Sequence, residues 1–332
     1  MKRYWFMVAA ATMTLTILII ALNNGYRIPR KYLYTMKEHE TVVKEVKLFN
    51  MSYFIGDDMR IYGYGRNKNG HNRLYQTKLD DGKPPSIVTL PNALKEIHIG
   101  EVKGVVLNGR PYLYVHTWGG LVNINNFSFN IPQESKRLFF QSRYKNYLWA
   151  IGTQTVVPLH YDVPPGNGRT HKNFLLFEHR EPMKKNRHLV VTSVTPHIIY
   201  EVDLGSGYMR PYSKTENPLA SHFDPKYHLF LSGGPIQLVD RQCYLVAGHM
   251  ANGGWGGIRM TFFYTFRDQY PFDILAVSKP IHFGYSRRLE YMNQIFLDRG
   301  KIYMSLGIDD DYTVLIRTPL SNILNALLPI SK

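Results

Sequence analysis

The stretch Gly104–Thr117, which reads GVVLNGRPYLYVHT, carries the pattern that decides the fold. An apolar run ends at Asn108-Gly109, and an aromatic-rich run follows. Asn-Gly between two such runs is the strongest short-range signal of a β-hairpin, because both residues tolerate the positive φ angles of a type I′ turn. The same unit recurs at Gly234–Gly248 and Asn293–Gly307. The sequence therefore predicts a domain of repeated antiparallel hairpins.

The remaining sequence continues this pattern. Short runs rich in Val, Ile, Tyr and Phe predict further strands, and these runs are Arg73–Leu79, Tyr147–Ile151, Phe174–Phe177, His188–Ser193, Ile198–Val202, Arg259–Phe266, Ile274–Val277 and Thr313–Arg317. Only Leu320–Leu328 predicts a helix, and the sequence shows no alternating βα units. We therefore expect an all-β fold. Radially repeated hairpins favour a β-propeller, and a two-sheet sandwich is the alternative.

The N-terminal segment has a different composition. Residues 5–22 form an uncharged, mostly apolar run that is long enough to cross a bilayer as a helix, and the site after Ala21 is poor for cleavage. We predict a cytosolic tail (1–4), a transmembrane signal anchor (5–22), a polar stem (23–48) and a propeller domain (49–332) that ends in a short helix. A cleaved signal peptide is the alternative. This layout predicts a single-pass type II membrane protein, with its domain in the Golgi or endoplasmic reticulum lumen or outside the cell.

The formal net charge is +15, and Cys243 is the only cysteine. A basic surface attracts phosphates, anionic glycans or lipid headgroups, and simple solubility is the alternative reason for such a charge. A lumenal domain does not meet nucleic acid, so we expect no nucleic-acid partner. A single cysteine excludes an intramolecular disulfide, and the apolar core must stabilise the fold without one.

Three stretches place charged or amide groups beside predicted strands. They are Asp57–Ile61, Lys172–Phe177 and Gly307–Asp311. Polar groups that converge from the strand ends of an all-β scaffold favour a carbohydrate-active site. The first two stretches also have a structural explanation, because Asp58 suits a turn and Lys172-Asn173 is a common solvated turn pair.

Further candidates lie between these stretches. His197 follows a proline at the start of a predicted strand, where it is either a ligand or an ordinary strand residue. His249 ends an apolar strand before a glycine-rich loop that contains Trp255. An aromatic ring in such a loop can stack on a sugar, and an exposed surface loop is the alternative. Asn50 and Asn126 begin N-glycosylation sequons.

Taken in order, these motifs resemble those of the five-bladed β-propeller enzymes of glycoside hydrolase family 130, the β-mannoside phosphorylases, and of related glycosyltransferases. The resemblance covers roughly residues 55–325. The matching stretches are Asp57-Asp58-Met59-Arg60, Lys172–Phe177, Pro196-His197, Gly233–Ile236, Tyr244–His249 and Gly307–Asp310. Asp57 stands where the family has Glu, and Phe174 where it has Trp. The resemblance implies a five-bladed propeller.

The resemblance also implies a role for each matched residue. Asp58 is the expected catalytic acid, which protonates the glycosidic oxygen through a sugar hydroxyl while phosphate acts as the nucleophile. Arg60 is expected to bind a sugar or phosphate oxygen, for which a planar bidentate donor is suited. The other expected substrate-binding residues are Asp57, Lys172, Asn173, His197, His249, Trp255, Asp309 and Asp310. We expect no cofactor and no metal, because three successive aspartates on a strand cannot all face one ion.

Three functions follow from this reading. The first is a membrane-anchored glycosyltransferase or phosphorylase acting on mannoglycans, with a glycan acceptor and a sugar-phosphate or sugar-nucleotide donor. The second is a glycosidase on the same fold, which needs a second carboxylate such as Glu101, Glu178 or one of Asp309–Asp311. The third is a non-catalytic glycan-binding propeller.

Overall fold

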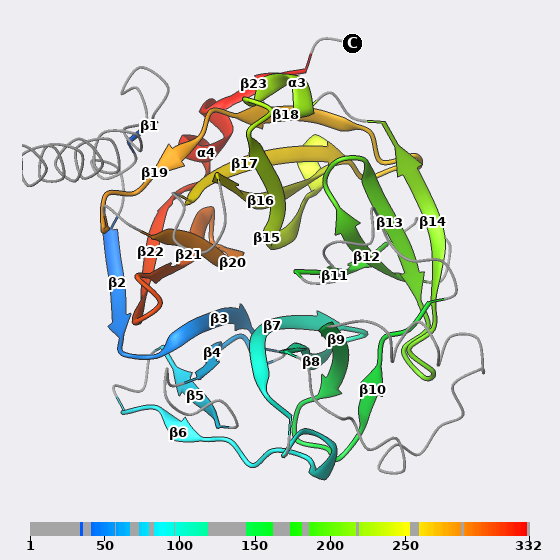
Figure 1. Ribbon diagram of the computed structural model, residues 1–332, viewed down its shortest axis with the longest axis vertical. Coiled ribbons are helices and arrows are strands. Elements are labelled where there is room, and N and C mark those ends of the chain that lie inside the picture. Colours follow the sequence, from blue (N-terminus) through cyan, green and yellow to red (C-terminus); the bar gives the residue numbers. More distant parts are fainter. Residues whose placement is uncertain are drawn as a thin grey trace, which may run out of the picture. The chain divides into compact units, whose positions relative to one another are not determined.

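The computed structural model describes residues 34–35, 41–56, 58–66, 73–79, 83–95, 97–118, 144–161, 173–180, 186–216, 219–252, 259–286 and 289–330. Residues 35–332 form one compact unit, and within it the strands build five antiparallel sheets around a common centre (Figure 1). The all-β fold and the five-bladed β-propeller expected from the sequence are confirmed. The predicted anchor, residues 5–22, lies outside the described residues. Among those described, no helix is long and apolar enough to span a membrane.

The first three blades follow one another along the chain, each as an antiparallel sheet. Blade 1 contains β3 (Phe49–Ile55), β4 (Ile61–Arg66), β5 (Leu74–Lys78) and β6 (Ser86–Ile87). Blade 2 contains β7 (Ile99–Leu107), β8 (Arg110–Trp118), β9 (Tyr144–Ala150) and β10 (Val156–Pro158). Blade 3 contains β11 (Leu175–His179), β12 (Arg187–Ser193), β13 (His197–Val202) and β14 (Met209–Thr215).

Blade 4 is more elaborate, and blade 5 joins both ends of the domain. Blade 4 contains β15 (Tyr227–Leu238), β16 (Cys243–Asn252) and β17 (Arg259–Arg267), with β18 (Ile274–Ser278) and β19 (Ile281–His282) on β17 and β23 (Leu327–Pro329) on β18. Blade 5 contains β20 (Glu290–Asp298), β21 (Lys301–Ile308), β22 (Tyr312–Pro319) and, from the N-terminal side, β2 (Thr41–Val46). A further short strand, β1, covers Tyr34–Thr35. Because β2 pairs with β22, the last residues of the predicted stem are part of the propeller.

Short helices join some of these strands. Besides the 3-10 turns η3 (Asn92–Leu94) and η5 (Val239–Arg241), the described residues contain α3 (Leu219–His222) and α4 (Leu320–Asn325). The predicted C-terminal helix therefore exists but is shorter than Leu320–Leu328, because the chain from Leu327 extends to pair with β18. α3 was not expected from the sequence.

One edge strand of each blade lies nearest the centre. These innermost strands, β3, β7, β11, β15 and β20, contact one another in a closed ring (Figure 1). Arg66, which pairs with the first residue of β3, donates a hydrogen bond from Nε to the carbonyl of Gly100 near the start of β7 (3.1 Å). The starts of β3 and β7 therefore lie at the same end of the domain. We call this the N-end, and the opposite end, where the innermost strands finish, the C-end.

Side chains bridge the centre between blades that are not neighbours. The Lys103 ammonium on β7 donates to the carbonyl of Ser232 on β15. The Gln294 amide on β20 donates to the carbonyl of Gly104 on β7 (3.0 Å). These contacts join blade 2 to blades 4 and 5 across the axis, so polar side chains occupy the propeller centre at this level.

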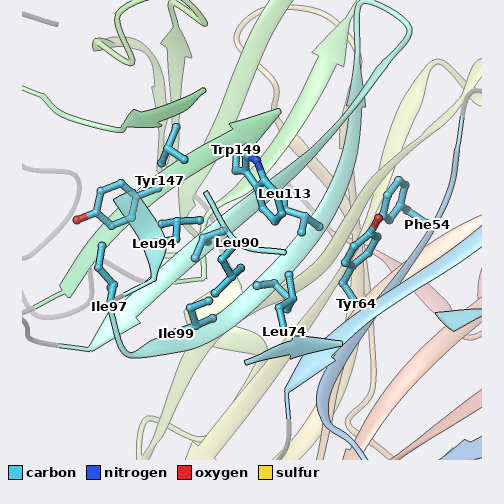
Figure 2. Close-up of a cluster of buried hydrophobic side chains, with 13 residues drawn as sticks. Phe54, Tyr64, Leu74, Leu90, Leu94, Ile97, Ile99, Leu113, Tyr147 and Trp149 are labelled. Atoms are coloured by element: carbon cyan, nitrogen blue, oxygen red, sulfur yellow. The ribbon is translucent and has the colours of Figure 1, made fainter. Parts of the chain in front are cut away.

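The blades pack against one another through apolar faces. Figure 2 shows the cluster between blades 1 and 2, where the Phe54 and Tyr64 rings stack with centroids 5.9 Å apart. Trp149 from the same cluster is buried, and its indole N–H donates to the Thr153 carbonyl (2.9 Å). Fully burying a large apolar side chain contributes about 1.5–3 kcal/mol, which lets the fold form without a disulfide.

Gly233 is a position where the ring of innermost strands tolerates no side chain. A Cβ there would lie 2.7 Å from the Ile295 nitrogen and 2.8 Å from Gln294 backbone atoms. Since the obstacle is backbone, Gly233→Ala is expected to lower the free energy of unfolding by about 3 kcal/mol, the upper end of the usual cost of overpacking. Gly205→Ala is the matched control, because its nearest neighbour is a surface side-chain oxygen at 3.3 Å. Urea denaturation checks both, and equal midpoints for the two variants would contradict the close approach.

Candidate functional site

Two charged side chains stand on β7 in an otherwise apolar strand. Glu101 and Lys103 are two residues apart, so both point to the same face of the strand. Their side chains are 15% and 5% exposed, and Glu101 Oε1 lies 3.5 Å from Lys103 Nζ. Charges withdrawn from water are costly unless they are paired. The pair of buried Lys103 and partly buried Glu101 at the centre of a propeller is therefore a candidate functional site.

Charged groups from blades 1, 4 and 5 surround this pair. Burial lowers the pKa of Arg66, and Tyr291, Asp310 and Glu101 each act in the opposite direction. Burial raises the pKa of Tyr291 well above its ordinary value, and Asp310 and Glu101 raise it further. The Arg259 guanidinium lies over the Tyr291 ring, 5.6 Å from its centroid. These interactions place Arg66, Tyr291, Asp310 and Arg259 in one cluster with the Glu101–Lys103 pair at the N-end, and we call these six side chains the axial cluster.

Blades 2 and 3 add neutral polar groups to the axial cluster. The Tyr114 hydroxyl donates to Asn146 Oδ1 (2.7 Å) and accepts a hydrogen bond from the backbone N–H of Phe174 (3.4 Å). Burial raises the pKa of Tyr114 well above its ordinary value, and Glu101 raises it further. Asn173, the residue before Phe174, is buried. Its backbone has a φ of 64°, a conformation that asparagine tolerates well. Protonated phenols and amides at this place can bind sugar hydroxyls.

His249 reaches the axial cluster through Ser232. Its Nδ1 lies 2.7 Å from the Ser232 hydroxyl, and the Ser232 carbonyl accepts the hydrogen bond of Lys103. Phe230 stacks on the imidazole, with centroids 5.0 Å apart. His249, Asn173 and Asp310 are therefore the sequence-predicted residues that the structure brings together around Glu101.

Asp58 and Arg60 lie elsewhere. They belong to the turn between β3 and β4, at the C-end of blade 1, whereas Arg66 closes β4 at the N-end. At a rise of about 3.3 Å per residue, β4 alone separates the two ends by roughly 17 Å. The Asp58 side chain is 42% exposed and accepts hydrogen bonds from the Tyr62 hydroxyl (2.7 Å) and the Arg60 N–H (3.1 Å). The Tyr62 hydrogen bond is the main reason that the pKa of Asp58 is lowered.

His197 is buried between blades 3 and 4. Its ring packs against Phe266 and Tyr264 of β17, with centroids 4.9 and 5.9 Å away. Burial lowers the pKa of His197 to about 4, and the nearby backbone of Phe272 opposes this only in part. His197 is therefore a neutral core residue at neutral pH.

The low pKa of His197 predicts acid sensitivity. The unfolded chain binds a proton near the ordinary pKa of about 6.5, and the folded chain does so only near pH 4, so stability falls as the pH falls through this window. The shift corresponds to about 3 kcal/mol at the acid limit. His197→Gln is expected to flatten the dependence between pH 6.5 and 4, measured by urea denaturation at several pH values. An unchanged slope in the variant would contradict this assignment.

The remaining predicted residues have other positions. Asp309 Oδ1 accepts a hydrogen bond from the Ser286 hydroxyl (2.6 Å), and the neighbouring Glu290 carboxylate accepts from the N–H groups of Phe283, Gly284 and Ser286. Asp309 thus helps to hold the loop before β20. Asn50 lies on the innermost strand β3, and the Ser52 of its sequon is buried. Asp57, Lys172, Trp255 and Asn126 lie outside the described residues.

The sequence analysis missed several members of the axial cluster. Lys103, Arg66, Tyr291 and Arg259 were not singled out, and Glu101 appeared only as a second carboxylate. One signal was readable, because Glu101 and Lys103 interrupt the apolar strand IGEVKGVVL at alternating positions. Charges on the inward side of a buried strand indicate a functional site more directly than charges in a turn.

A cleft lies at the C-end of blades 2 and 3. It has a volume of about 640 Å³ and is lined by Asn108, Asn186, Arg187, His188, Glu201, Val202, Asp203, Leu204, Gly205, Tyr208 and Arg210. Glu201 accepts hydrogen bonds from both Arg187 (3.1 Å) and Arg210 (2.6 Å). The lining of this cleft has two arginines and two carboxylates, Glu201 and Asp203, whereas the axial cluster has three cations and two carboxylates. The axial cluster is therefore the stronger candidate for binding an anion.

No protein-family model matches the sequence, and no curated protein matches it. Solved structures with the same fold include a β-1,2-mannobiose phosphorylase from Listeria innocua bound to β-1,2-mannobiose, at 11% identity and a TM-score of 0.51, covering 91% of this chain and 98% of that one. A mannose phosphorylase from Leishmania mexicana in complex with phosphate ion matches at 10% identity and a TM-score of 0.51, over 97% and 98% of the two chains.

A third similar structure belongs to the GH130 family of mannoside phosphorylases, which contains glycoside hydrolases that target β-1,2 mannosidic linkages in Candida mannan. It matches at 11% identity and a TM-score of 0.55, over 87% of this chain and 91% of that one. At these identities the likeness concerns the fold. The chain therefore has the five-bladed β-propeller fold found in mannoside phosphorylases and related glycoside hydrolases.

Proposed function

We propose that this chain is a carbohydrate-active enzyme that transfers a mannosyl group between a glycan and an anionic partner, phosphate or a sugar nucleotide, at the axial cluster. The observation that carries the proposal is the partly buried Glu101 carboxylate beside the buried Lys103, with Arg66 and Arg259 in the same cluster. Three cations against the two carboxylates Glu101 and Asp310 leave an excess of positive charge for an anionic substrate. Structures with this fold that bind phosphate or β-1,2-mannobiose support the choice of substrates.

Glu101 is the proposed proton-transfer group. In phosphorolysis its carboxylic acid gives a proton to the glycosidic oxygen while phosphate attacks the anomeric carbon. In synthesis its carboxylate takes the proton from the acceptor hydroxyl. The cations of the cluster stabilise the phosphate in both directions, as preorganised charges do at phosphoryl and oxyanion sites. Asn173, Tyr114 and His249 supply neutral hydrogen-bonding groups for sugar hydroxyls.

Hydrolysis is the second candidate, and one observation favours it. Asp310 acts on the same Arg66 and Tyr291 side chains as Glu101, so the cluster contains two carboxylates. A hydrolase needs one carboxylate to protonate the leaving group and a second to activate water. Phosphate dependence separates hydrolysis from phosphorolysis.

The proposal includes a location. Residues 5–22 are proposed as the membrane anchor of a type II protein whose propeller faces the Golgi or endoplasmic reticulum lumen or the exterior, as their apolar composition favours. Protease treatment of intact microsomes or cells tests this. Protection by the microsomal membrane, or cleavage on intact cells, supports the proposed orientation. A propeller digested from the cytosolic side refutes it.

The activity is tested with the full-length protein in detergent. It is incubated with β-1,2-mannobiose with and without phosphate, with mannose phosphates and mannose, and with a panel of sugar nucleotides. Phosphate-dependent release of mannose phosphate establishes a phosphorylase, and transfer from a sugar nucleotide establishes a glycosyltransferase. Phosphate-independent release of mannose establishes a glycosidase. Glycan binding without turnover under all conditions refutes the enzyme proposal and leaves the glycan-binding propeller.

A further inference from the structure

Ser232 connects two charged or ionisable groups of the axial cluster. Its carbonyl accepts the hydrogen bond of the Lys103 ammonium, and its hydroxyl contacts Nδ1 of His249 at 2.7 Å. Ser232 and His249 are 1% and 8% exposed. Both groups are therefore held by one residue in an environment that water hardly reaches.

The buried Ser232 hydroxyl needs an acceptor for its proton. Among the described residues, its hydrogen-bond partner is His249 Nδ1. If Nδ1 carried a proton, it would donate to the serine oxygen and leave the serine O–H without an acceptor, which costs about 1–3 kcal/mol for a buried group. The serine therefore donates and Nδ1 accepts.

The surroundings also disfavour a charged imidazole. The Lys103 ammonium is hydrogen-bonded to the same serine, so an imidazolium would add a second positive charge beside it. The Phe230 ring stacks on the imidazole and excludes water from one side. A neutral ring with Nδ1 as acceptor carries its proton on Nε2.

The hydroxyl group of Thr261 lies beside His249. Thr261 is the cross-strand partner of His249 on β17, so the two side chains lie on the same face of the sheet. Thr261 is 1% exposed, and its Oγ1 has no hydrogen-bond partner among the described residues. An unsatisfied buried hydroxyl of this kind indicates a place for a polar ligand atom or a water.

We infer that Ser232 is a positioning residue that fixes His249 as a neutral imidazole with its proton on Nε2, which makes His249 a hydrogen-bond donor to a sugar or phosphate oxygen. In this role His249 binds substrate and does not transfer protons. The inference rests on the proposed function only in assuming that the axial cluster takes such a ligand, because the protonation state is a property of the resting protein.

The test is nitrogen-15 NMR of the full-length protein labelled at histidine, with the His249 signals assigned by their loss in His249→Asn. Wild type and Ser232→Thr, which keeps the hydroxyl, are expected to show Nδ1 unprotonated and Nε2 protonated. Ser232→Ala is expected to lose this preference and to show both tautomers. A protonated Nδ1 in the wild type, or an unchanged pattern in Ser232→Ala, overturns the inference.

Binding provides the second measurement. Affinities for inorganic phosphate and for β-1,2-mannobiose are determined separately by calorimetry. Ser232→Ala is expected to weaken at least one of them roughly tenfold, the effect of losing one well-placed hydrogen bond, and Ser232→Thr is expected to restore it. Ser86→Ala on the exposed edge strand β6 is the control for a neutral serine substitution. If the wild type binds neither probe, the proposed function fails while the NMR result still decides the tautomer. Equal affinities in wild type and Ser232→Ala refute the positioning role.

Discussion

Glu101→Gln is expected to lower the turnover of the enzyme on the order of a hundred- to ten-thousand-fold, the usual cost of removing a general acid or base. Gln keeps the size of the side chain but cannot exchange a proton. Glu101 is partly buried beside Lys103 at the N-end, where it interacts electrostatically with Arg66 and Tyr291, as Asp310 also does. The measurement is turnover of whichever substrate pair proves active, with circular dichroism to confirm that the variant is folded.

Asp58→Asn is the paired variant, because the sequence motifs assign the acid to Asp58. That assignment stays a prediction, and the geometry argues for the opposite result. Asp58 is an exposed turn residue whose pKa is lowered by Tyr62, and it lies at the C-end. We therefore expect Asp58→Asn to change turnover less than about threefold. An inactive Asp58→Asn with an active Glu101→Gln would restore the motif-based assignment and refute the axial one.

The hairpins of this propeller were predictable because their turn chemistry is local. Asn108 and Gly109 have the positive φ angles, 50° and 70°, that their types predict, and Arg299-Gly300 repeats this in blade 5 with 47° and 73°. Such turns fix the register of the two strands they join, and they do so independently of contacts with distant parts of the chain. This is why the strand pairs of the repeated unit could be read from the sequence.

Contacts between distant segments could not be predicted in the same way. β2 completes blade 5 by pairing with β22, more than 250 residues further along the chain, and no local pattern in Thr41–Val46 specifies that partner. The short apolar segment Leu327–Pro329 likewise becomes a strand because its backbone pairs with the edge of β18. Local composition alone assigned the first segment to a stem and the second to a helix.

The candidate site was only partly predictable, for a physical reason. A charged residue near a strand can lie at either end of the domain, and the motif Asp57–Arg60 did not reveal that its turn faces the C-end. His249, Asn173 and Asp310 were identified from their motifs and do lie at the N-end. The cations Arg66 and Arg259 come from different blades, so only the closed ring of strands brings them together.

Lys103→Met is expected to lower the free energy of unfolding by about 3 kcal/mol, the lower end of the cost of removing one partner of a buried ion pair, because Glu101 is only partly buried. The substitution leaves the Glu101 carboxylate, 15% exposed, without its nearest cation, and leaves the Ser232 carbonyl without its donor. Most of this cost arises from the carboxylate that remains, since methionine fills a similar volume.

The double variant Glu101→Gln/Lys103→Met separates that cost from the loss of the cross-axis contact. If the unpaired carboxylate causes most of the stability loss, the double variant should be more stable than Lys103→Met alone. The sum of the two single changes in the free energy of unfolding should then differ from the change in the double variant by at least about 1 kcal/mol. Urea denaturation of the wild type and the three variants measures this coupling. Additive effects would mean that Lys103 stabilises the propeller through Ser232 and not through Glu101. In that case Arg66, which also acts on Glu101, supplies the charge that keeps the carboxylate buried.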